Sequence, residues 1–518
     1  MAEILALANA NLITMAARDI AKGTLVIEDG RIAQIIEGES SLNLDLSSNQ
    51  VIHLSGKTIL PGFIDSHTHL VLTGFSMESV NLSDARSIDD VLALIGDQAS
   101  QAESGDWVFG TQLVYRLLRE KRNPTLEELD RVSPKNPVWL VANTGHSSVV
   151  NTLGFQRVGL SPDSPGVEKE ARTGRLTGTY ATDQSHFEAH RRIFSSLGLN
   201  RIQGMIEGAC NLAVRRGVTT LHALDGSAEE DRIFRILLEA MPRMPLRIVP
   251  YFQTMDVNHI LELGLPRIGG CLALDGAWLE HTVALREPYQ DLPDCRGMLF
   301  YTDVQLESFV QKAHESGLQI SMHGIGDAAI EQLLRAYEKA LAKSPRTDHR
   351  HRIEHFSLPT DDQVARARDL GIVAAMQPMF SFNIGGPDGA YVEYLGEERA
   401  NRVEDFRALI DKGITVCGGS DSPITPIDPI MGIHAAVNNP FVHHRVSVEE
   451  ALQMFTSNGA SAAFEEDLKG TIEVGQLADL VVLEDNPKTL ASGRLRDIRV
   501  SMTVVGGRTV WQSDSLVR

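Results

Sequence analysis

Two histidines stand one residue apart in the run PGFIDSHTHL at residues 61–70. In an extended strand, residues two apart point to the same side and lie about 6.6 Å apart, so His67 and His69 can meet at one metal ion. A second pair with this spacing, His349 and His351, stands in the charged run RTDHRHR. We expect this second pair to be solvated rather than ligating, because it precedes its strand amid charged residues.

Three more residues that could bind a metal ion follow short apolar runs later in the chain. His323 closes the run LQISMH, His355 closes RIEH, and Asp421 follows ITVCGGS. Taken singly, a buried histidine is better explained as a hydrogen-bonded core residue than as a ligand. The joint placement of all of them at the ends of apolar runs favours a shared site.

The apolar runs alternate with longer stretches that have the periodicity of amphipathic helices. Eight such runs follow one another from residue 58: TILPGFID, GVTTLHALD, LRIVPYF, GGCLALDG, LQISMHGIGD, RIEHFS, IVAAMQP and ITVCGGSD. Eight β–α units in one domain predict an α/β fold, a (β/α)8 barrel. Barrels of this type carry their reactive groups at the carboxyl ends of the strands, so the candidate ligands should meet at one end.

This set of side chains predicts metal-assisted hydrolysis. Imidazoles with one carboxylate suit Zn²⁺ or another divalent ion, and the residues leave open whether one or two ions bind. Such an ion lowers the pKa of a bound water toward about 7 and polarises a carbonyl group. Asp421 could then take a proton from that water and pass it to a leaving nitrogen.

The composition excludes several other classes of function. The chain of 518 residues is 43% hydrophobic and 22% charged, and its formal net charge is −20. This charge disfavours nucleic acid and anionic membranes as partners, and we expect a small-molecule substrate instead. The four cysteines, Cys210, Cys271, Cys295 and Cys417, lie too far apart to suggest a disulfide framework. We expect a cytoplasmic enzyme without a signal peptide or membrane span, and a homodimer is a reasonable expectation for its assembly.

The flanks of the barrel have a different pattern. Short apolar strands and turns fill residues 1–57 and recur toward the end of the chain. We expect residues 1–57 and 425–518 to form one composite β-sandwich with C-terminal helices, and residues 58–424 to form the barrel. The stretch 75–200 is too long for one crossover helix. It should be an insertion with its own strands, DWVFGTQLVY and NPVWLVA.

Several long runs resemble the amidohydrolase superfamily, and more narrowly the amidohydrolase-3 group with its N-substituted formamide deformylases and YtcJ-like proteins. They are PGFIDSHTHL, HGIGDAAI, RIEHF, GGSDSP, GTIEVGQLADLVVLEDNP and, outside the ligand runs, PTLEELD, GHSSVVNTLGF and DGAWLEHTVALREPYQD. The resemblance spans nearly the whole chain. It implies a distorted barrel, a composite β-sandwich and hydrolysis of C–N bonds. It also implies metal ligation by His67, His69, His323 and His355, with Asp421 as ligand and base.

The chain departs from this family at one position. Many relatives carry a carboxylated lysine that bridges two metal ions where the present sequence reads GGCLALDG, and the matching residue is Cys271. If that run is a strand, Cys271 and Asp275 share its inward face. Cys271 could then ligate a metal ion, or it could be a buried thiol that acts as a small apolar residue.

Four other residues are candidates for contacts with substrate. His146, in NTGHSSVVN, resembles a substrate-facing histidine of the family that could polarise the scissile carbonyl, or it could be structural. Asp275 could orient the substrate or a metal ligand. Trp278 and Phe380 could line the pocket or serve only in packing.

We therefore expect a metal-dependent amidohydrolase that cleaves an amide or formamide-type C–N bond of a small molecule. A mononuclear deaminase acting on an aminoheterocycle is the nearest alternative, since it needs no bridging ligand. A catalytically inactive binding scaffold is an alternative from another class.

Overall fold

The computed structural model describes residues 4–38, 51–226 and 231–516. Two parallel sheets occupy its centre and carry the candidate ligands. The first has the order β14-β13-β6 and the second the order β15-β16-β17-β18-β19. The strands are β6 (Phe63–Thr68), β13 (Val218–Asp225), β14 (Arg247–Phe252), β15 (Arg267–Ile268), β16 (Gln319–Gly324), β17 (Arg352–His355), β18 (Val373–Met376) and β19 (Thr415–Gly418).

Backbone hydrogen bonds join the two sheets at both of their ends. The Gly269 N–H donates to the carbonyl of Phe252 at 3.1 Å, beside β14 and β15. The Asp421 N–H donates to the carbonyl of His67 at 2.8 Å, which brings the chain after β19 against β6. The ladder hydrogen bonds divide the eight central strands into a sheet of three and a sheet of five.

Two of the predicted strands differ from those in the structure. The run TILPGFID is divided, because β5 (Thr58–Pro61) belongs to another sheet and only β6 joins the central ones. The prediction of a strand in GGCLALDG is wrong. The strand β15 ends before this run, because Gly269 and Gly270 adopt left-handed conformations with φ of 97° and 56° that an extended strand cannot contain. Only an isolated parallel bridge, from Ala273 to His323, remains in this run.

Helices follow most of the central strands. They are α6 (Leu199–Arg215), α7 (Arg232–Ala240), α8 (Val257–Glu262), α9 (Asp303–Glu315), α10 (Asp327–Lys343), α11 (Asp361–Leu370), α12 (Pro378–Ile384), α13 (Ala390–Leu395), α14 (Glu397–Ala400) and α15 (Phe406–Asp411). In α10, buried residues such as Ile330, Leu333 and Leu334 recur at helical spacing and pack into the main core. The capping boxes at Thr302 and Thr360 fix the starts of α9 and α11.

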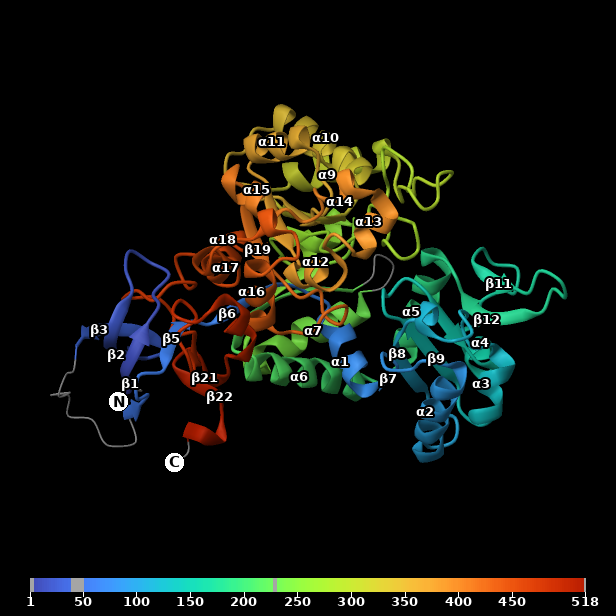
Figure 1. Cartoon of the computed structure of the whole chain (residues 1–518), viewed down its shortest axis with the longest axis horizontal. Helices are drawn as coiled ribbons and strands as arrows, with labels where there is room; N and C mark the ends of the chain where they lie inside the picture. Colours follow the sequence, from blue (N-terminus) through green and yellow to red (C-terminus); the bar gives the residue numbers. More distant parts are fainter. Residues whose placement is uncertain (1–3, 39–50, 227–230, 517–518) are drawn as a thin grey trace.

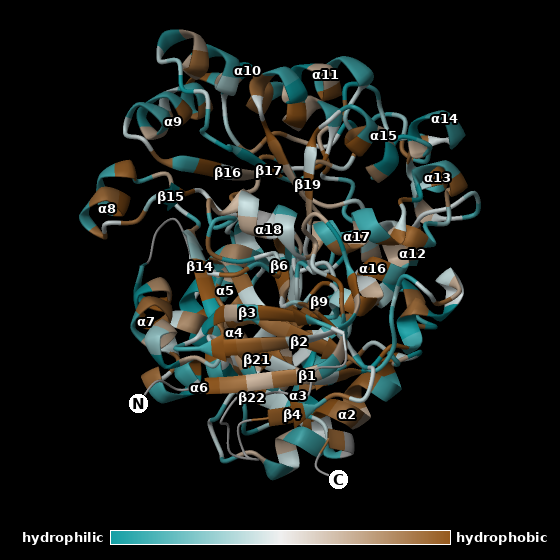
Figure 2. Ribbon diagram, turned by 90° about the vertical axis from the view of Figure 1, so that its left-hand side faces the viewer, coloured by the Kyte–Doolittle hydropathy of each residue, from teal (hydrophilic) through white to brown (hydrophobic). Residues whose placement is uncertain are grey.

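Strands from both ends of the chain form one further sheet, with the order β22-β21-β20-β5-β1-β2-β3 and β4 paired to β1. They are β1 (Ile4–Leu12), β2 (Ile20–Glu28), β3 (Arg31–Glu37), β4 (Val51–His53), β20 (Leu480–Leu483), β21 (Val500–Val505) and β22 (Arg508–Gln512). The helices α16 (Pro429–Val437), α17 (Val448–Met454) and α18 (Ser457–Ala462) precede its C-terminal strands. Strands β1, β2 and β3 are largely hydrophobic (Figure 2), as burial against a separate core requires. The domain boundaries stay a prediction.

The segment after β6 begins with α1 (Leu70–Glu78) and builds a sheet of the order β11-β12-β10-β9-β8-β7. Its strands are β7 (Val80–Asn81), β8 (Val108–Leu113), β9 (Val138–Ala142), β10 (Ser148–Val150), β11 (Val167–Lys169) and β12 (Leu176–Tyr180). Its helices are α2 (Ile88–Gln101), α3 (Leu126–Val132), α4 (Thr152–Val158) and α5 (Asp183–Ser196). This insertion and the sheet of the chain ends lie on opposite sides of the central strands (Figure 1).

In the described part of the chain, every helix is too short or too polar to cross a membrane.

Candidate metal centre and active site

Strand ends place the candidate ligands around one point. His67 lies near the end of β6 and His69 directly before α1, while His323 and His355 lie at the ends of β16 and β17. Asp421 follows β19 in the loop that hydrogen-bonds to His67. His355 and Asp421 have φ of 70° and 54°, a region that is costly for residues with a side chain. The surrounding structure holds both in these conformations at the centre of the cluster.

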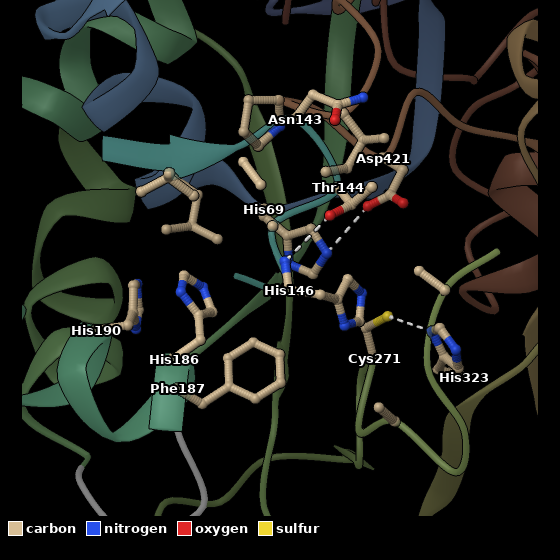
Figure 3. Close-up of a pocket in the computed structure, with 18 of the residues that line it drawn as sticks. His69, Asn143, Thr144, His146, His186, Phe187, His190, Cys271, His323 and Asp421 are labelled. Atoms are coloured by element: carbon tan, nitrogen blue, oxygen red, sulfur yellow. Dashed lines mark hydrogen bonds and ion pairs between the residues drawn. The ribbon is translucent and has the colours of Figure 1, made fainter. Parts of the chain in front are cut away.

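The candidate ligand atoms gather around two acidic side chains, Asp421 and Cys271. Asp421 Oδ1 lies 3.2 Å from Nε2 of His67 and 3.0 Å from Nε2 of His69. Cys271 Sγ lies 3.7 Å from both Nδ1 of His323 and Nε2 of His355. Two sets could each hold a metal ion: His67, His69 and Asp421, and His67, Cys271 and His355. Figure 3 shows His69, Cys271, His323 and Asp421 around one space.

A second contact holds each of the four imidazoles by the nitrogen that faces away from the cluster. The contacts are His67 Nδ1 to Glu354 Oε2 at 2.7 Å, His69 Nδ1 to the carbonyl of Leu224 at 2.8 Å, His355 Nδ1 to Gln377 Oε1 at 2.7 Å and His323 Nε2 to Asp275 Oδ1 at 3.3 Å. Contacts of this kind orient the rings of metal-binding histidines and fix their tautomers.

Charges within the cluster shift the pKa of its members strongly. Burial alone would lower the pKa of His69, but Asp421 and Cys271 raise it to about 10. Burial would raise the pKa of Asp421, yet His67 and His69 hold it well below its usual range. The pKa of the Cys271 thiol, which burial would also raise, is instead held well below its ordinary value by His67 and the other histidines. The site therefore combines a carboxylate and a thiolate that favour positive charge between them.

The residues present fit a divalent metal ion. Nε2 of His67 and Oδ1 of Asp421 are buried and have no hydrogen-bond partner among the described residues. Leaving such atoms unpaired is costly unless a ligand such as a metal ion satisfies them. Imidazole, carboxylate and thiolate are the donors that zinc takes in proteins.

The cluster lies in a cavity of about 970 Å³. The insertion supplies one wall, where α5 carries His186, Phe187 and His190 on the side opposite Asp421 and Cys271 (Figure 3). Most other lining residues are apolar or aromatic: Val71, Phe75, Trp139, Phe194, Leu224, Trp278, Phe300, Phe380, Tyr391 and Tyr394. A cavity of this size and character accommodates a small organic molecule.

Comparison with known proteins settles the family. The model of the amidohydrolase family matches residues 50–511 of the chain. The chain belongs to the amidohydrolase family. This confirms the family predicted from its motifs.

Relatives of this amidohydrolase match it over nearly their whole length. An N-substituted formamide deformylase from Arthrobacter pascens is 27% identical, and the match covers 96% of each chain. YtcJ of Bacillus subtilis (strain 168) is 28% identical over 89% of this chain and 90% of its own. A metal-dependent hydrolase of Pyrococcus furiosus, of uncharacterised function, superimposes with a TM-score of 0.77 at 28% identity, over 94% of this chain and 100% of its own. These matches confirm the superfamily's α/β fold for this chain.

The structure places three of the four predicted substrate contacts in the cavity lining. His146, Trp278 and Phe380 all line it, and the ring of Phe380 stacks on that of His355 with centroids 6.1 Å apart. Asp275 instead is fully buried and accepts hydrogen bonds from the N–H groups of Ala284, Ile325 and Gly326. This position favours the orientation of His323 over contact with substrate, which were the two roles left open for Asp275.

The second histidine pair is buried, so the expectation that it is solvated is wrong. His349 and His351 are 2% and 0% exposed. His351 Nδ1 accepts from the Ile320 N–H at 3.1 Å and its Nε2 lies 2.9 Å from Nδ1 of His314. His349 Nε2 donates to the carbonyl of Leu370 at 2.7 Å. The rings satisfy backbone groups between strands and helices, which explains why they are buried in this amidohydrolase.

Two groups of residues near the site were missed in the sequence. Arg352 and Glu354 form a buried pair behind His67, and their alternation with apolar neighbours in RIEHF was the available signal. His186 and His190 line the cavity from α5, and their spacing of four residues on a helix predicts that they share a face. Burial holds the pKa of His190 at about 4, with a smaller effect of His69, so its imidazole is neutral.

Proposed function

We propose that this protein is a metal-dependent amidohydrolase that cleaves an amide or formamide-type C–N bond of a small molecule. The observation that supports it best is the convergence of Nε2 of His67 and Nε2 of His69 on Oδ1 of Asp421, at 3.2 and 3.0 Å, beside a large and mostly apolar cavity. The name of the Arthrobacter pascens relative, an N-substituted formamide deformylase, points to the same class of bond.

The divalent metal, for which zinc is our proposal, would be held by His67, His69, His323, His355, Asp421 and Cys271. When bound, it would supply Lewis-acid polarisation of the carbonyl and acidification of a water molecule. Asp421 accepts the proton of the attacking water and delivers it to the leaving nitrogen. His146, on the cavity wall, donates a hydrogen bond to the carbonyl oxygen as negative charge develops there.

Cys271 supports a site for two ions. Its Sγ atom lies 3.7 Å from a ring nitrogen of both His323 and His355, and it could share an ion with His67 and His355. We propose that it replaces the bridging lysine of relatives.

We also propose that the two parallel sheets act as one distorted (β/α)8 barrel. The sheet of the chain ends would be the composite β-sandwich predicted for residues 1–57 and 425–518.

The apolar walls support an uncharged substrate with a bulky apolar group. Arg191 is the only lysine or arginine among the described residues that line the cavity, and Glu188 binds it at 2.7, 2.8 and 3.0 Å. An anionic substrate would therefore find no lysine or arginine among the described lining residues that is not already paired with a carboxylate. We also propose a cytoplasmic location for such an enzyme.

A substrate screen tests this function. The zinc-loaded protein would be assayed against formamides, N-acyl amino acids, lactams and aminoheterocycles, with amine and ammonia release measured separately. Amine release from an amide supports the proposal. Ammonia release from an aminoheterocycle would favour the deaminase instead. Ligand binding without turnover, undiminished when the metal is removed, would favour a binding scaffold.

A further inference from the structure

A buried ion pair lies directly behind one of the metal-binding histidines. Arg352 and Glu354 are two residues apart on β17, so both point to the same side, and both are 0% exposed. The guanidinium Nε lies 2.8 Å from Glu354 Oε1, and Nη2 lies 3.0 Å from Oε2. Glu354 Oε2 also lies 2.7 Å from Nδ1 of His67, while the hydroxyl of Ser321 donates to Oε1.

All five N–H groups of Arg352 face acceptors. Two of them donate to the carboxylate oxygens of Glu354. The other three donate to Nδ1 of His222 at 2.8 Å, the hydroxyl oxygen of Tyr251 at 3.0 Å and the carbonyl of Ser66 at 2.7 Å. Tyr251 can accept this bond because its own proton goes to Gln319 Oε1 at 2.8 Å. A guanidinium with every donor engaged has one orientation, and it does not lose its charge in proteins.

This arrangement determines where the proton on His67 lies. The fixed cation keeps Glu354 ionised, and an ionised carboxylate only accepts hydrogen bonds. The proton between Glu354 and His67 must therefore reside on Nδ1 of the imidazole. In the neutral ring, Nε2 then carries a lone pair, and this is the atom that faces Asp421 without a hydrogen-bond partner among the described residues.

The other three histidines are held differently. His69 and His355 are held by neutral oxygens, of a backbone carbonyl and of Gln377. Asp275, behind His323, is surrounded by backbone N–H groups. Among the described residues of the site, only His67 is backed by a carboxylate that an arginine clamps, and His67 belongs to both possible metal groups.

We propose that Arg352 and Glu354 are a positioning unit for the metal centre, which locks His67 in the tautomer that ligates through Nε2. The inference rests on the proposed metal-dependent function. Neither residue touches substrate. They raise the affinity for metal because the hydrogen bond from Nδ1 of His67 to Glu354 leaves Nε2 free to ligate.

The test measures zinc affinity of the full chain by competition with a chelator, and it does not depend on turnover. We expect Glu354→Gln to weaken zinc binding about 10- to 100-fold, as loss of an outer contact to a ligating histidine usually does. The matched control is Glu404→Gln. Glu404 is 1% exposed and its carboxylate accepts hydrogen bonds from the hydroxyl groups of Ser381, Tyr391 and Ser357, so zinc affinity should stay within about threefold.

Arg352→Lys and Ser321→Ala complete the set. The lysine keeps the positive charge that holds Glu354 ionised, so it should bind zinc more tightly than Glu354→Gln. Ser321→Ala leaves the ion pair whole and serves if Glu354→Gln does not fold; we expect zinc release to the chelator to become a few-fold faster. Equal zinc affinity in wild type and Glu354→Gln, or unchanged release in Ser321→Ala where Glu354→Gln is unfolded, would overturn the proposal. Failure of the wild type to bind zinc would instead overturn the proposed function itself, and the positioning role with it.

Discussion

The Sγ atom of Cys271 lies 3.7 Å from Nε2 of His355. A zinc ion with bonds of about 2.3 Å to sulfur and 2.0 Å to nitrogen, at a tetrahedral angle, separates these two atoms by about 3.5 Å. Nδ1 of His323 lies at the same 3.7 Å from this sulfur. Each imidazole therefore has about the spacing from the thiol that two ligands of one zinc ion have, and Cys271, His355 and His67 together lie within reach of one ion.

The first prediction follows from this spacing. Cys271→Ala should lose about one equivalent of zinc and most of its activity, because the group around His323 and His355 loses its anionic ligand. Elemental analysis alongside an amide hydrolysis assay measures both. Cys210→Ala is the control, since Cys210 is buried in α6 within the apolar core. Unchanged zinc content and rate in the Cys271 variant would remove this residue from the site and leave one ion on the histidines and Asp421.

Replacing the carboxylate of Asp421 should abolish most of the catalytic activity and leave the protein folded. Asp421→Asn keeps the shape of the side chain but cannot accept a proton, so we expect kcat to fall about 10²- to 10⁴-fold. Circular dichroism and zinc analysis should show a folded protein that retains most of its metal. A variant with more than about a tenth of the normal kcat would contradict the role of general base.

The two histidine pairs should respond to alanine in opposite ways. His67→Ala and His69→Ala should each lose metal and activity together. His351→Ala should keep its metal but lower the free energy of unfolding by about 1–3 kcal/mol, since the Ile320 N–H loses its acceptor. Denaturant unfolding and elemental analysis of the same preparations decide between these outcomes. Loss of zinc from the His351 variant would show that the pair contributes to the metal site.

Buried neutral histidines predict loss of stability in mild acid. Burial lowers the pKa of His349 to about 4, against about 6.5 in an unfolded chain. The unfolded state therefore binds the proton first, so this contribution is complete above pH 6.5 and is lost as the pH falls toward 4. The shift corresponds to about 3 kcal/mol. Unfolding curves at pH 7.5, 6 and 5 should show a smaller loss for His349→Gln, which cannot titrate; equal losses would contradict the assignment.

A matched pair of amides tests the charge selectivity of the cavity. N-(2-phenylethyl)formamide and N-formylphenylalanine differ by a single carboxylate. We expect kcat/KM to be about 100-fold higher for the uncharged compound, because Glu188 already neutralises Arg191 and the described lining residues offer the carboxylate no other lysine or arginine. Comparable values for the two compounds would show that the cavity holds a cation for anionic substrates.

The sequence placed the candidate ligands at strand ends because strands can be recognised from short-range patterns. His67 and His69 share one run, and the strand ends at His323 and His355 follow from apolar patterning. Patterning does not report what a residue contacts across the sheets. His349 and His351 were therefore placed in solvent, although backbone groups from distant segments bury them.

The position of Cys271 shows a related limit. Its apolar run reads as a strand, but Gly269 and Gly270 interrupt it, and a Cβ on Gly269 would lie 2.2 Å from the carbonyl oxygen of Ser321. Cys271 nevertheless lies beside His323, because the isolated bridge at Ala273 keeps the chain against β16. The resemblance to the family predicted that Cys271 lies near the metal site. Only the structure shows the backbone conformation that places it there.

The strand that leads into the metal centre depends on the far end of the chain. Strand β5 pairs with β20, Thr58 with Leu483 and Pro61 with Leu480, and β5 runs directly into β6 and His67. A ribosome must therefore make the whole stretch between the two strands, the central strands included, before β5 acquires this partner. The run that leads to His67 and His69 therefore gains this support only after His323, His355 and Asp421, other candidate ligands of the chain, have been made.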